Sequence, residues 1–439
     1  MSSLAVPTPD LTASVTRNAE APGMLHPLAA RYAAVRAQTE SLTTTLQTED
    51  FVVSSMSDVS PTKWHLAHTS WFFETFVLSP HLASYQALNP KYSFLFNSYY
   101  VQAGERHCRA QRGLVTRPTV AEVFAYRAHV DSAMRALFGE IGDDADHPAL
   151  GTIELGLHHE QQHQELLVTD IKHVFWTNPM RPQFAARAEL PAAPVAAMGW
   201  CSYDEGVYSI GHRGDSFAFD NEAPAHREFV EAFRLGSRLV TNGEYLDFIL
   251  AGGYRKPDLW LSNGWGVVQE QRWQAPLYWK ETPDGWTEFS LAGVRPLAAS
   301  EPVCHVSYYE ADAFARWAGA RLPSEAEWEI AAGEAPVEGT FVESRRFHPS
   351  PAEAAAGPAL QQLYGDVWQW TQSPYVAYPG FTPAPGAIGE YNGKFMCDQW
   401  VLRGASCATP RSHARSTYRN FFPSDVRWQF TGIRLATGS

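Results

Sequence analysis

Cysteine is scarce in this chain, and long apolar runs are missing. The five cysteines are odd in number and contain no CxxC pair, so the sequence predicts no disulfide framework and indicates a reducing compartment, which we expect to be the cytoplasm. No stretch of about 18 apolar residues is present, so we expect no membrane span. Residues 1–22 are polar and lack the apolar centre of a secretory signal, and we expect them to form a flexible tail.

Basic tracts are also lacking. The chain has 34 Lys and Arg against 47 Asp and Glu, and its net charge of −13 argues against nucleic acid as a partner. Aromatic residues are abundant, with 15 Trp, 18 Tyr and 24 Phe. Such residues supply core area, and they also supply stacking and cation–π surfaces for small ligands. We therefore expect small-molecule substrates, and the composition leaves a homo-oligomer open.

One stretch, residues 155–167, organises the rest of the chain. It contains no Pro and consists of good helix formers, so it predicts a helix. On a helix, His159 and His163 lie one above the other, and Leu155, Leu166 and Leu167 fall on or beside the same stripe. A buried imidazole needs a partner, and two stacked imidazoles are most simply satisfied by a metal ion.

Residues 159–163 also spell His-Glu-x-x-His, the pattern of zinc peptidases. That interpretation requires a third ligand downstream. The long form of the motif has Gly and His where this chain has Leu166 and Thr169, and His173 falls about a quarter-turn from the stripe. The third ligand must therefore come from another part of the chain.

His68 is the candidate for that third ligand. Ser60 and Pro61 predict a helix start, and on the helix that follows, His68 shares a face with Trp64, Trp71 and Phe72. A lone inward histidine is more often an ordinary core residue bonded to a carbonyl or a Glu. The histidine pair on another apolar helix face favours a metal ligand instead.

The order of elements predicts an α+β chain of two domains. Helical patterns at 26–46, after Pro61, at 118–138 and at 146–176 predict a four-helix bundle over 23–180 with a metal in its core. Residues 181–194 are rich in Pro and predict a linker. Residues 195–439 are rich in Gly, Pro and Trp and predict a loop-rich α+β domain, with helices at 241–250, 308–318 and 324–331.

Within the first domain, residues 80–117 look irregular. Tyr99 and Tyr100 precede three arginines at a spacing of three, Arg106, Arg109 and Arg112. Guanidinium groups at this spacing suit carboxylate recognition, and loops on a rigid scaffold often carry binding residues. A solvated basic loop is an equally good interpretation.

The second half resembles the formylglycine-generating-enzyme/sulfatase-modifying fold, a relative of the C-type lectin fold. The resemblance covers nearly all of 195–439. True formylglycine generators use a paired-cysteine copper site, which is missing here, so that activity is not expected. The motifs that carry the resemblance are Thr241-Asn-Gly-Glu-Tyr245, Pro302-Val-Cys-His-Val-Ser307, Arg321-Leu-Pro-Ser-Glu-Ala-Glu-Trp-Glu329, Gly365-Asp-Val-Trp-Gln-Trp-Thr371, Leu402-Arg-Gly-Ala-Ser406 and Gly432-Ile-Arg-Leu435.

The first half resembles the DinB-like metal-binding four-helix bundle, at His68 and at the His-Glu-x-Gln-His stretch 159–163. The two domains in this order resemble the EgtB-type ergothioneine-pathway sulfoxide synthases, over about residues 25–437. This resemblance implies iron(II) bound by His68, His159 and His163. It also implies O2-dependent joining of a thiol sulfur to C2 of the imidazole of Nα-trimethylhistidine, with sulfoxide formation.

The resemblance also implies roles for substrate-binding residues. Gln162 matches the glutamine that holds the substrate imidazole. Asn420 matches the asparagine that contacts the trimethylated amino acid, and we expect Phe421 beside it to offer an aromatic face to the quaternary ammonium. Tyr378 is a further substrate-binding candidate. Phe422 stands where members that use γ-glutamylcysteine have Asp.

The Phe422 departure favours free cysteine as the sulfur donor, with its carboxylate held by Arg106, Arg109 or Arg112. In some members the tyrosine that supplies a proton comes from the second domain, near Tyr375 or Tyr378 here. We favour Tyr99 and Tyr100 as the proton donors. The alternative is that either tyrosine has only a packing role. The remaining question is whether Glu160 and Glu165 orient the ligand histidines or are solvated.

Several alternatives stay open on the sequence alone. The first is the same reaction with γ-glutamylcysteine, and the second is a selenium-transferring selenoneine synthase. A relative that makes 5-histidylcysteine sulfoxide usually carries a third domain that this chain lacks. A zinc-dependent DinB-type thiol S-transferase and a lectin-like binding module belong to different functional classes.

Overall fold

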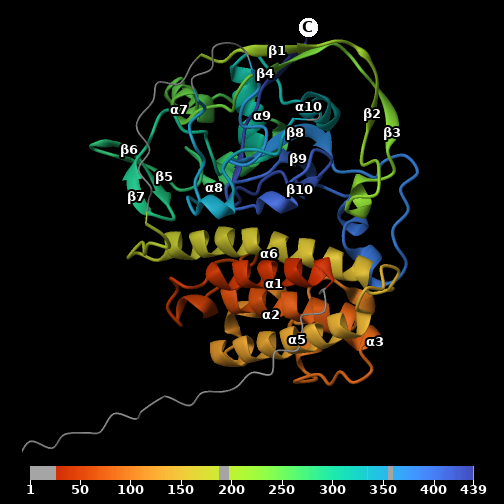
Figure 1. Ribbon diagram of the computed structural model, residues 1–439. Helices are drawn as coiled ribbons and strands as arrows, with labels where there is room; N and C mark the ends of the chain where they lie inside the picture. The colour runs from red at the N-terminus through yellow and green to blue at the C-terminus, as the bar shows by residue number, and fades with distance from the viewer. Residues whose placement is uncertain (1–25, 187–196, 334, 354–358, 439) are drawn as a thin grey trace, which may run out of the picture.

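The computed structural model describes residues 26–186, 197–333, 335–353 and 359–438, and shows two stacked domains (Figure 1). A helical bundle forms one layer and a loop-rich α+β domain forms the other, which confirms the expected fold class. The expected tail, residues 1–22, lies outside the described residues, as does most of the expected linker, 181–194.

Four long helices build the bundle, in the four regions where the sequence predicts helices. The connections between them are mostly irregular, with short helical turns at Tyr92–Leu95, Val101–Ala103 and Arg109–Leu114. Thr119 begins the third long helix with a capping box to Glu122. No helix in the described ranges is long and apolar enough to cross a membrane. The long helices are α1 (Pro27–Ser41), α2 (Thr62–Phe73), α5 (Val120–Ile141) and α6 (Leu150–Thr177); α2 continues through a π-helical turn (Glu74–Leu78) into α3 (Ser79–His81).

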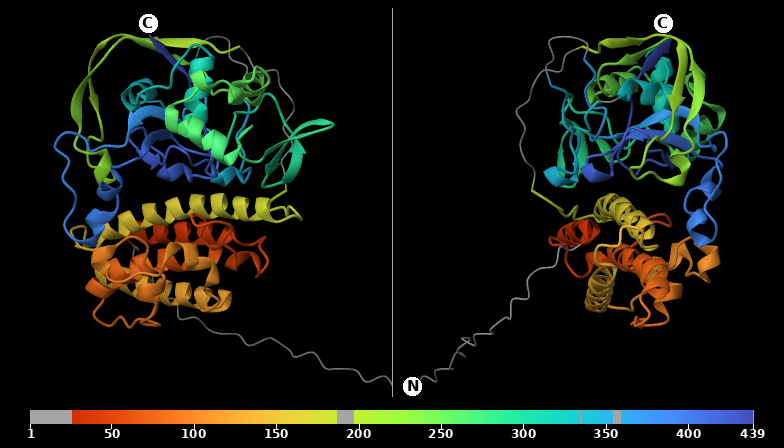
Figure 2. Two further views of the ribbon diagram at one scale, coloured as in Figure 1. Left: turned by 180° about the vertical axis from the view of Figure 1, so that it is seen from behind. Right: turned by 45° about the vertical axis from the view of Figure 1, so that its right-hand side comes forward.

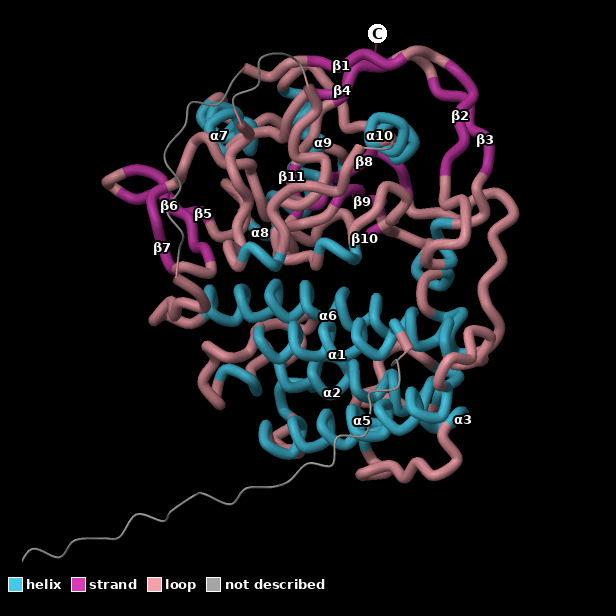
Figure 3. The backbone as a smooth tube through the Cα atoms, viewed as in Figure 1, coloured by secondary structure: helices cyan, strands magenta, loops and turns pink. Residues whose placement is uncertain are grey.

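The second domain is built on short strands (Figure 3). Within the described residues they pair antiparallel, except for β8 with β11, which is parallel. Its four-stranded sheet has the order β10-β9-β8-β11, and a second sheet has the order β1-β4-β12. A hairpin, β2-β3, and a three-stranded sheet, β5-β6-β7, complete the strands. The bounds are β1 Trp200–Tyr203, β2 Gly206–Ile210, β3 His226–Val230, β4 Phe233–Gly236, β5 Trp279–Thr282, β6 Gly285–Ser290, β7 Gly293–Pro296, β8 Trp368–Pro374, β9 Trp400–Gly404, β10 Asn420–Phe422, β11 Thr431–Gly432 and β12 Ala436–Gly438.

In the described part of the second domain, four α-helices accompany these sheets. Three of them, α7 (Asn242–Leu250), α9 (Tyr308–Trp317) and α10 (Glu325–Ala332), occur where the sequence predicts helices, each with a capping box at its start. The fourth, α8 (Ser262–Gln271), was not predicted, because its first turns contain two glycines and it has no side-chain cap.

The two domains meet along α6, which lies between the other bundle helices and the second domain (Figures 1 and 2). Glu165 on this helix is partly buried, and no hydrogen bond within the described part of the chain joins it to a ligand histidine. Its carboxylate accepts hydrogen bonds from Trp368 Nε1 at 2.8 Å, Ser406 Oγ at 2.5 Å and Thr409 Oγ1 at 2.6 Å, all in the second domain. The carboxylate of Glu165 thus ties the bundle to the second domain.

On the bundle side, α6 approaches α2 closely at Gly156. A Cβ atom built there would lie 2.6 Å from Cε1 of Phe73 and 3.0 Å from Cε1 of Phe72. Non-bonded carbon atoms pack at about 3.5–4.0 Å. A larger residue at this position would therefore force the Phe72 and Phe73 rings to move.

Glu160 forms the polar centre of the bundle. It is fully buried, and its carboxylate pairs with Arg36 at 2.9 Å and Arg127 at 3.0 Å and accepts from Thr39 Oγ1 at 2.7 Å. Burial alone would raise the pKa of Glu160, but Arg36 and Arg127 outweigh it and hold the pKa at about 2. Both expectations for Glu160, ligand orientation and solvation, are therefore wrong, because the carboxylate joins α6 to α1 and α5.

We predict that Glu160→Gln lowers the free energy of unfolding of the bundle by about 3–5 kcal/mol, because two buried guanidinium groups lose their shared anion. The folded pKa lies below the unfolded value of about 4.3, so the contribution of Glu160 is present above that pH and is lost as pH falls toward 2. Urea unfolding, followed by circular dichroism at neutral and acidic pH, measures both effects.

The matched control is Glu154→Gln on the same helix. Glu154 pairs with Arg31 at the surface, where the side chains are 31% and 47% exposed, so its loss should cost no more than about 1 kcal/mol. Equal urea midpoints for the two variants would contradict the role of Glu160.

Candidate metal centre

Three histidines from α2 and α6 converge in the bundle. One ligand nitrogen from each of His68, His159 and His163 lies within 4.8 Å of the others, and all three side chains are buried. His68 Nε2 and both ring nitrogens of His159 have no hydrogen-bond partner among the described residues. Unpaired buried nitrogens are costly, and one ligand nitrogen from each of three rings, within this distance of one another, suits a metal ion.

The rings of His68 and His159 are held in different ways. His68 Nδ1 lies 2.6 Å from the carbonyl oxygen of Phe96 and therefore donates to it, which leaves Nε2 as the free acceptor nitrogen. The His68 ring stacks between Trp64 and Trp71, with centroid distances of 4.5 and 5.4 Å. His159 packs against Phe72 at 4.7 Å.

The environment keeps these imidazoles neutral. Burial lowers the pKa of His68 and His163 well below its ordinary value and that of His159 to about 3. Neighbouring imidazoles lower the pKa of His68 and His163 further. Near neutral pH each ring therefore offers a lone pair, as a metal ligand must.

A second group of potential ligand atoms, from Glu288, Glu301 and His348, lies in the second domain. Arg295 occupies it: its Nη2 atom lies 2.6 Å from Glu288 Oε1 and also pairs with Glu301 and contacts His348. The guanidinium group already supplies the positive charge that a cation would bring. This group is therefore a buried ion-pair cluster rather than a metal site.

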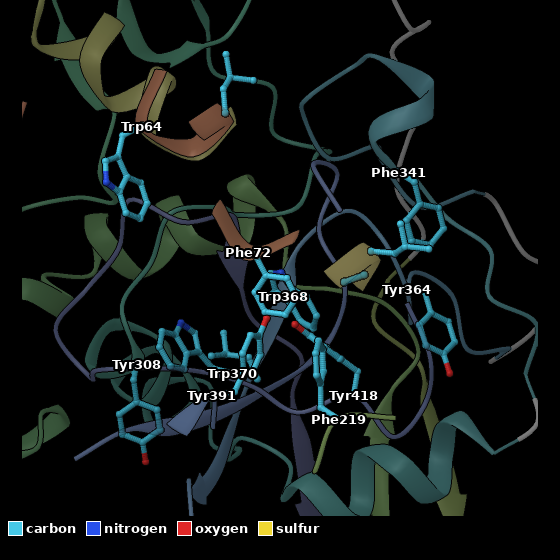
Figure 4. Packing of buried hydrophobic residues seen from close by; sticks show 14 of the residues in the cluster. Trp64, Phe72, Phe219, Tyr308, Phe341, Tyr364, Trp368, Trp370, Tyr391 and Tyr418 are labelled. Atoms are coloured by element: carbon cyan, nitrogen blue, oxygen red, sulfur yellow. The ribbon is translucent and has the colours of Figure 1, made fainter. Parts of the chain in front are cut away.

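Aromatic side chains of the second domain gather in one buried cluster with Phe72 of α2 (Figure 4). Phe219 stacks with Tyr391 at 5.3 Å and contacts Tyr418 at 5.6 Å, and Tyr391 lies 5.7 Å from the His159 ring. Gln162 bridges the two tyrosines, because its Nε2 donates to Tyr418 Oη at 2.6 Å and its Oε1 accepts from Tyr391 Oη. Gln162 therefore has a fixed amide orientation beside the three histidines.

Tyr99 and Tyr100 lie on the bundle side of the same aromatic group. Their rings stack at 4.6 Å, and they lie 6.2 and 6.4 Å from Tyr391. Burial raises the pKa of all three phenols, so each keeps its proton at neutral pH. The Tyr100 hydroxyl is buried and has no hydrogen-bond partner in the described part of the chain.

A clasp from the second domain holds the loop that carries these tyrosines. We use this name for residues Ala387–Phe395, which join β8 to β9 and reach down to the bundle (Figure 2). The Glu390 carboxylate accepts from the backbone N–H groups of Val101 at 2.7 Å and Gln102 at 3.0 Å. Lys394 donates to the carbonyl oxygen of Tyr99.

Of the three arginines in the loop, only Arg112 lies in the interior. Its guanidinium carbon is 3.4 Å from the centroid of Trp64, the ring that stacks on His68, and Nη1 donates to Ser60 Oγ at 2.9 Å. Burial lowers the pKa of Arg112 to about 9, so it remains a cation at neutral pH. Arg106 and Arg109 are exposed and bond to the backbone of Ser98 and Asp58.

The other substrate-binding candidates lie farther along the second domain. Asn420 begins β10, and its Oδ1 accepts from the backbone N–H of Phe421. Phe421 stacks on Tyr375 at 4.1 Å, and Phe422 lies edge-on to Trp428 at 6.1 Å. All of these residues are partly or fully buried.

Tyr378 lies in a different cluster. Its hydroxyl contacts Arg403 at 3.0 Å and Glu325 at 3.3 Å, and Arg419 covers its ring. Among the described residues, no recorded contact joins Tyr378 to the three histidines. The Tyr375 hydroxyl accepts a hydrogen bond from Asn221 at 2.8 Å. Tyr391, also in the second domain, is the tyrosine whose ring lies beside that of His159.

Sequence reasoning missed His65, Asp170 and Tyr391. His65 lies one turn before His68 on α2, and its Nδ1 is 2.9 Å from Nδ1 of His163. Asp170 lies seven residues after His163 on α6, at a helical repeat that places the two on one face. That spacing was a usable signal, whereas nothing in the sequence pattern connects Tyr391 to Gln162, 229 residues away.

Comparison with known proteins identifies both domains. Residues 31–167 match the DinB superfamily, and residues 187–357 and 343–438 match the sulfatase-modifying factor enzyme 1-like domain. The chain is 33% identical over 412 residues to the hercynine oxygenase of Mycobacterium tuberculosis, which covers 86% of this chain and 91% of that protein. The chain belongs to the hercynine oxygenase family.

A second member of the hercynine oxygenase family, from Mycolicibacterium thermoresistibile, is also 33% identical, over 86% of this chain and 87% of its own length. Among solved structures, PvdO from Pseudomonas aeruginosa matches 57% of this chain and 99% of its own length, with a TM-score of 0.36 and 19% identity. That score is too low to add to the assignment, which depends on the hercynine oxygenases.

Proposed function

We propose that this chain is an iron(II)- and O2-dependent sulfoxide synthase that joins the sulfur of cysteine to imidazole C2 of Nα-trimethylhistidine (hercynine). The observation that carries the proposal is the convergence of three neutral imidazoles next to the Tyr391 ring. The chain's relatives are named hercynine oxygenases. His68, His159 and His163 would hold the iron(II), which supplies, when bound, the reduction of O2 beside a ligated thiolate.

The overall reaction balances with O2 as the oxidant. The C2–H and S–H bonds are lost, a C–S bond forms, one oxygen atom ends on sulfur and the other leaves as water with both hydrogens. O2 therefore accepts four electrons, two from C–S coupling and two from oxidation of the sulfur. This balance requires a proton donor at the oxygen atom that becomes water.

Gln162 suits the substrate imidazole. A carbonyl oxygen accepts two hydrogen bonds, so Gln162 Oε1 can accept an imidazole N–H while it also accepts from Tyr391. Phe219 and Tyr418 border the same amide and offer aromatic faces. A quaternary ammonium donates no conventional hydrogen bond and is bound by such faces, to which Phe421 and Asn420 would add on β10.

Arg112 suits the cysteine carboxylate. It is a buried cation whose hydrogen bonds are to hydroxyl groups and not to a carboxylate, and its Nε has no partner among the described residues. A guanidinium group in this state gains most from an incoming anion. Arg106 and Arg109 would then contribute only from the loop surface.

Tyr99 and Tyr100 are the proposed proton donors. Their phenols are protonated, buried and adjacent, and Tyr391 approaches them from the second domain. The relatives named above give no support to a selenoneine synthase or a zinc-dependent thiol S-transferase. The reaction with γ-glutamylcysteine remains the alternative for the sulfur donor.

Product mass spectrometry tests the reaction and the donor together. We expect the iron(II)-loaded chain to form the sulfoxide from trimethylhistidine, O2 and cysteine. With γ-glutamylcysteine we expect a roughly 10- to 100-fold lower kcat/KM, because Phe422 offers no charged hydrogen-bond partner to the dipeptide.

Phe422→Asp should raise kcat/KM for the dipeptide, and His163→Ala should give no product. Product from the dipeptide alone would keep the reaction class and overturn the donor, whereas no product from either thiol would overturn the function.

Arg112→Gln should raise KM for cysteine roughly 10- to 100-fold and leave KM for trimethylhistidine nearly unchanged, because a carboxylate loses its buried cation. O2-uptake kinetics with each substrate varied in turn measure both constants. Arg106→Gln, the exposed control, should stay within about twofold of the parent. A rise confined to the Arg106 variant would place the carboxylate at the loop surface.

Tyr100→Phe should lower kcat by roughly 10²- to 10⁴-fold with little change in either KM, because a positioned proton donor acts only in the transition state. Tyr99→Phe tests its stacked neighbour in the same assay. Tyr375→Phe is the control, since its hydroxyl bonds to Asn221 and lies apart from this group. If Tyr391→Phe alone lost activity, the proton would come from the second domain.

A further inference from the structure

His65 is a buried histidine that the proposed chemistry does not use. It lies on α2 one turn before His68, yet its ring turns to His163 and not to the point where the three candidate ligands meet. Nδ1 of His65 is 2.9 Å from Nδ1 of His163, and Nε2 of His65 is 3.0 Å from Oδ2 of Asp170. The three side chains form a continuous chain of hydrogen bonds inside the bundle.

Asp170 determines which atom donates in each of these hydrogen bonds. Its carboxylate accepts from the backbone N–H of Ser60 at 2.8 Å, from Trp428 Nε1 at 3.2 Å and from His65 Nε2. A neutral imidazole carries one hydrogen, so donation from Nε2 makes Nδ1 of His65 an acceptor. Nδ1 of His163 must then be the donor across the 2.9 Å contact, which leaves Nε2 of His163 with its lone pair.

We propose that His65 and Asp170 are positioning residues for the metal, and that they fix the tautomer and ring orientation of His163. This inference rests on the proposed role of His163 as a metal ligand. Hydrogen bonds to the non-ligating nitrogen are the usual means by which a protein orients a histidine ligand. His68 obtains the same constraint from the Phe96 carbonyl, whereas neither nitrogen of His159 has a partner among the described residues.

The far end of this chain of hydrogen bonds belongs to the second domain. Trp428 lies in the segment between β10 and β11, and its indole N–H reaches the carboxylate of Asp170 on α6. The Trp428 ring also meets Phe422 edge-on. Docking of the second domain against α6 therefore contributes to the orientation of a ligand that belongs to the bundle.

Iron(II) affinity of the full chain, measured without O2 by competition with a chelator, tests the proposal. We expect His65→Phe to weaken iron(II) binding roughly 10- to 100-fold, the range found when a ligand's hydrogen-bond partner is removed. His65→Gln, which keeps an acceptor for His163 and a donor for Asp170, should recover most of the affinity. Trp428→Phe should lose less, roughly two- to tenfold, because Asp170 keeps its other donors.

The control is His173→Phe, on α6, the helix that carries His163 and Asp170. His173 bonds to Ser55 Oγ at 2.7 Å and takes no part in the chain of hydrogen bonds, so its iron(II) affinity should match the parent. The d–d absorption bands of cobalt(II)-loaded protein provide a second readout: they should change in His65→Phe and return in His65→Gln. Such a return separates ligand orientation from a general loss of fold.

Two results would overturn the inference. One is parental iron(II) affinity and unchanged cobalt(II) bands in His65→Phe; the other is equal losses in His65→Phe and His65→Gln. A parent chain that binds neither metal would instead overturn the proposed function, on which the inference rests.

Discussion

The desolvation of three imidazoles at one point is the constraint on which the rest of this molecule depends. His68, His159 and His163 are buried, neutral and turned toward one another, and two of them present nitrogens with no hydrogen-bond partner among the described residues. Such an arrangement costs free energy in the absence of a cation. The surrounding structure maintains it through the Phe96 carbonyl, the Trp64 and Trp71 stack, and the cluster around Glu160.

Helix α6 meets this constraint with all of its faces at once. One stripe carries the ligand histidines and Asp170, and a second stripe carries Glu160 toward α1 and α5. A third stripe, with Gln162 and Glu165, bonds to the second domain. A helix this polar would ordinarily face water, yet Glu160, Gln162, Glu165 and Asp170 each bond to specific partners, so the helix can be buried between two domains.

The sequence predicted the four bundle helices, three of the four helices in the second domain, and the histidines that meet, because periodicity and caps are local signals. It could not decide the fate of Glu160 and Glu165, since a buried carboxylate and a solvated one look alike until their partners are known. It missed α8, because two glycines in its first turns lower the helix propensity of that stretch. The contact between Tyr391 and Gln162 and the hydrogen bonds to Glu165 could not be predicted, because both depend on how the two domains dock.

The glycine at position 156 has a consequence for coordination geometry. It lies one turn before His159, at the level where α6 passes Phe72 and Phe73 of α2. Any larger residue would push the rings of Phe72 and Phe73 from their present positions to restore ordinary carbon contacts. The Phe72 ring packs on the ring of His159, and a metal site tolerates displacements of only about 0.5 Å in its ligands. The absence of a side chain at position 156 thus leaves room for the ring that supports a ligand histidine.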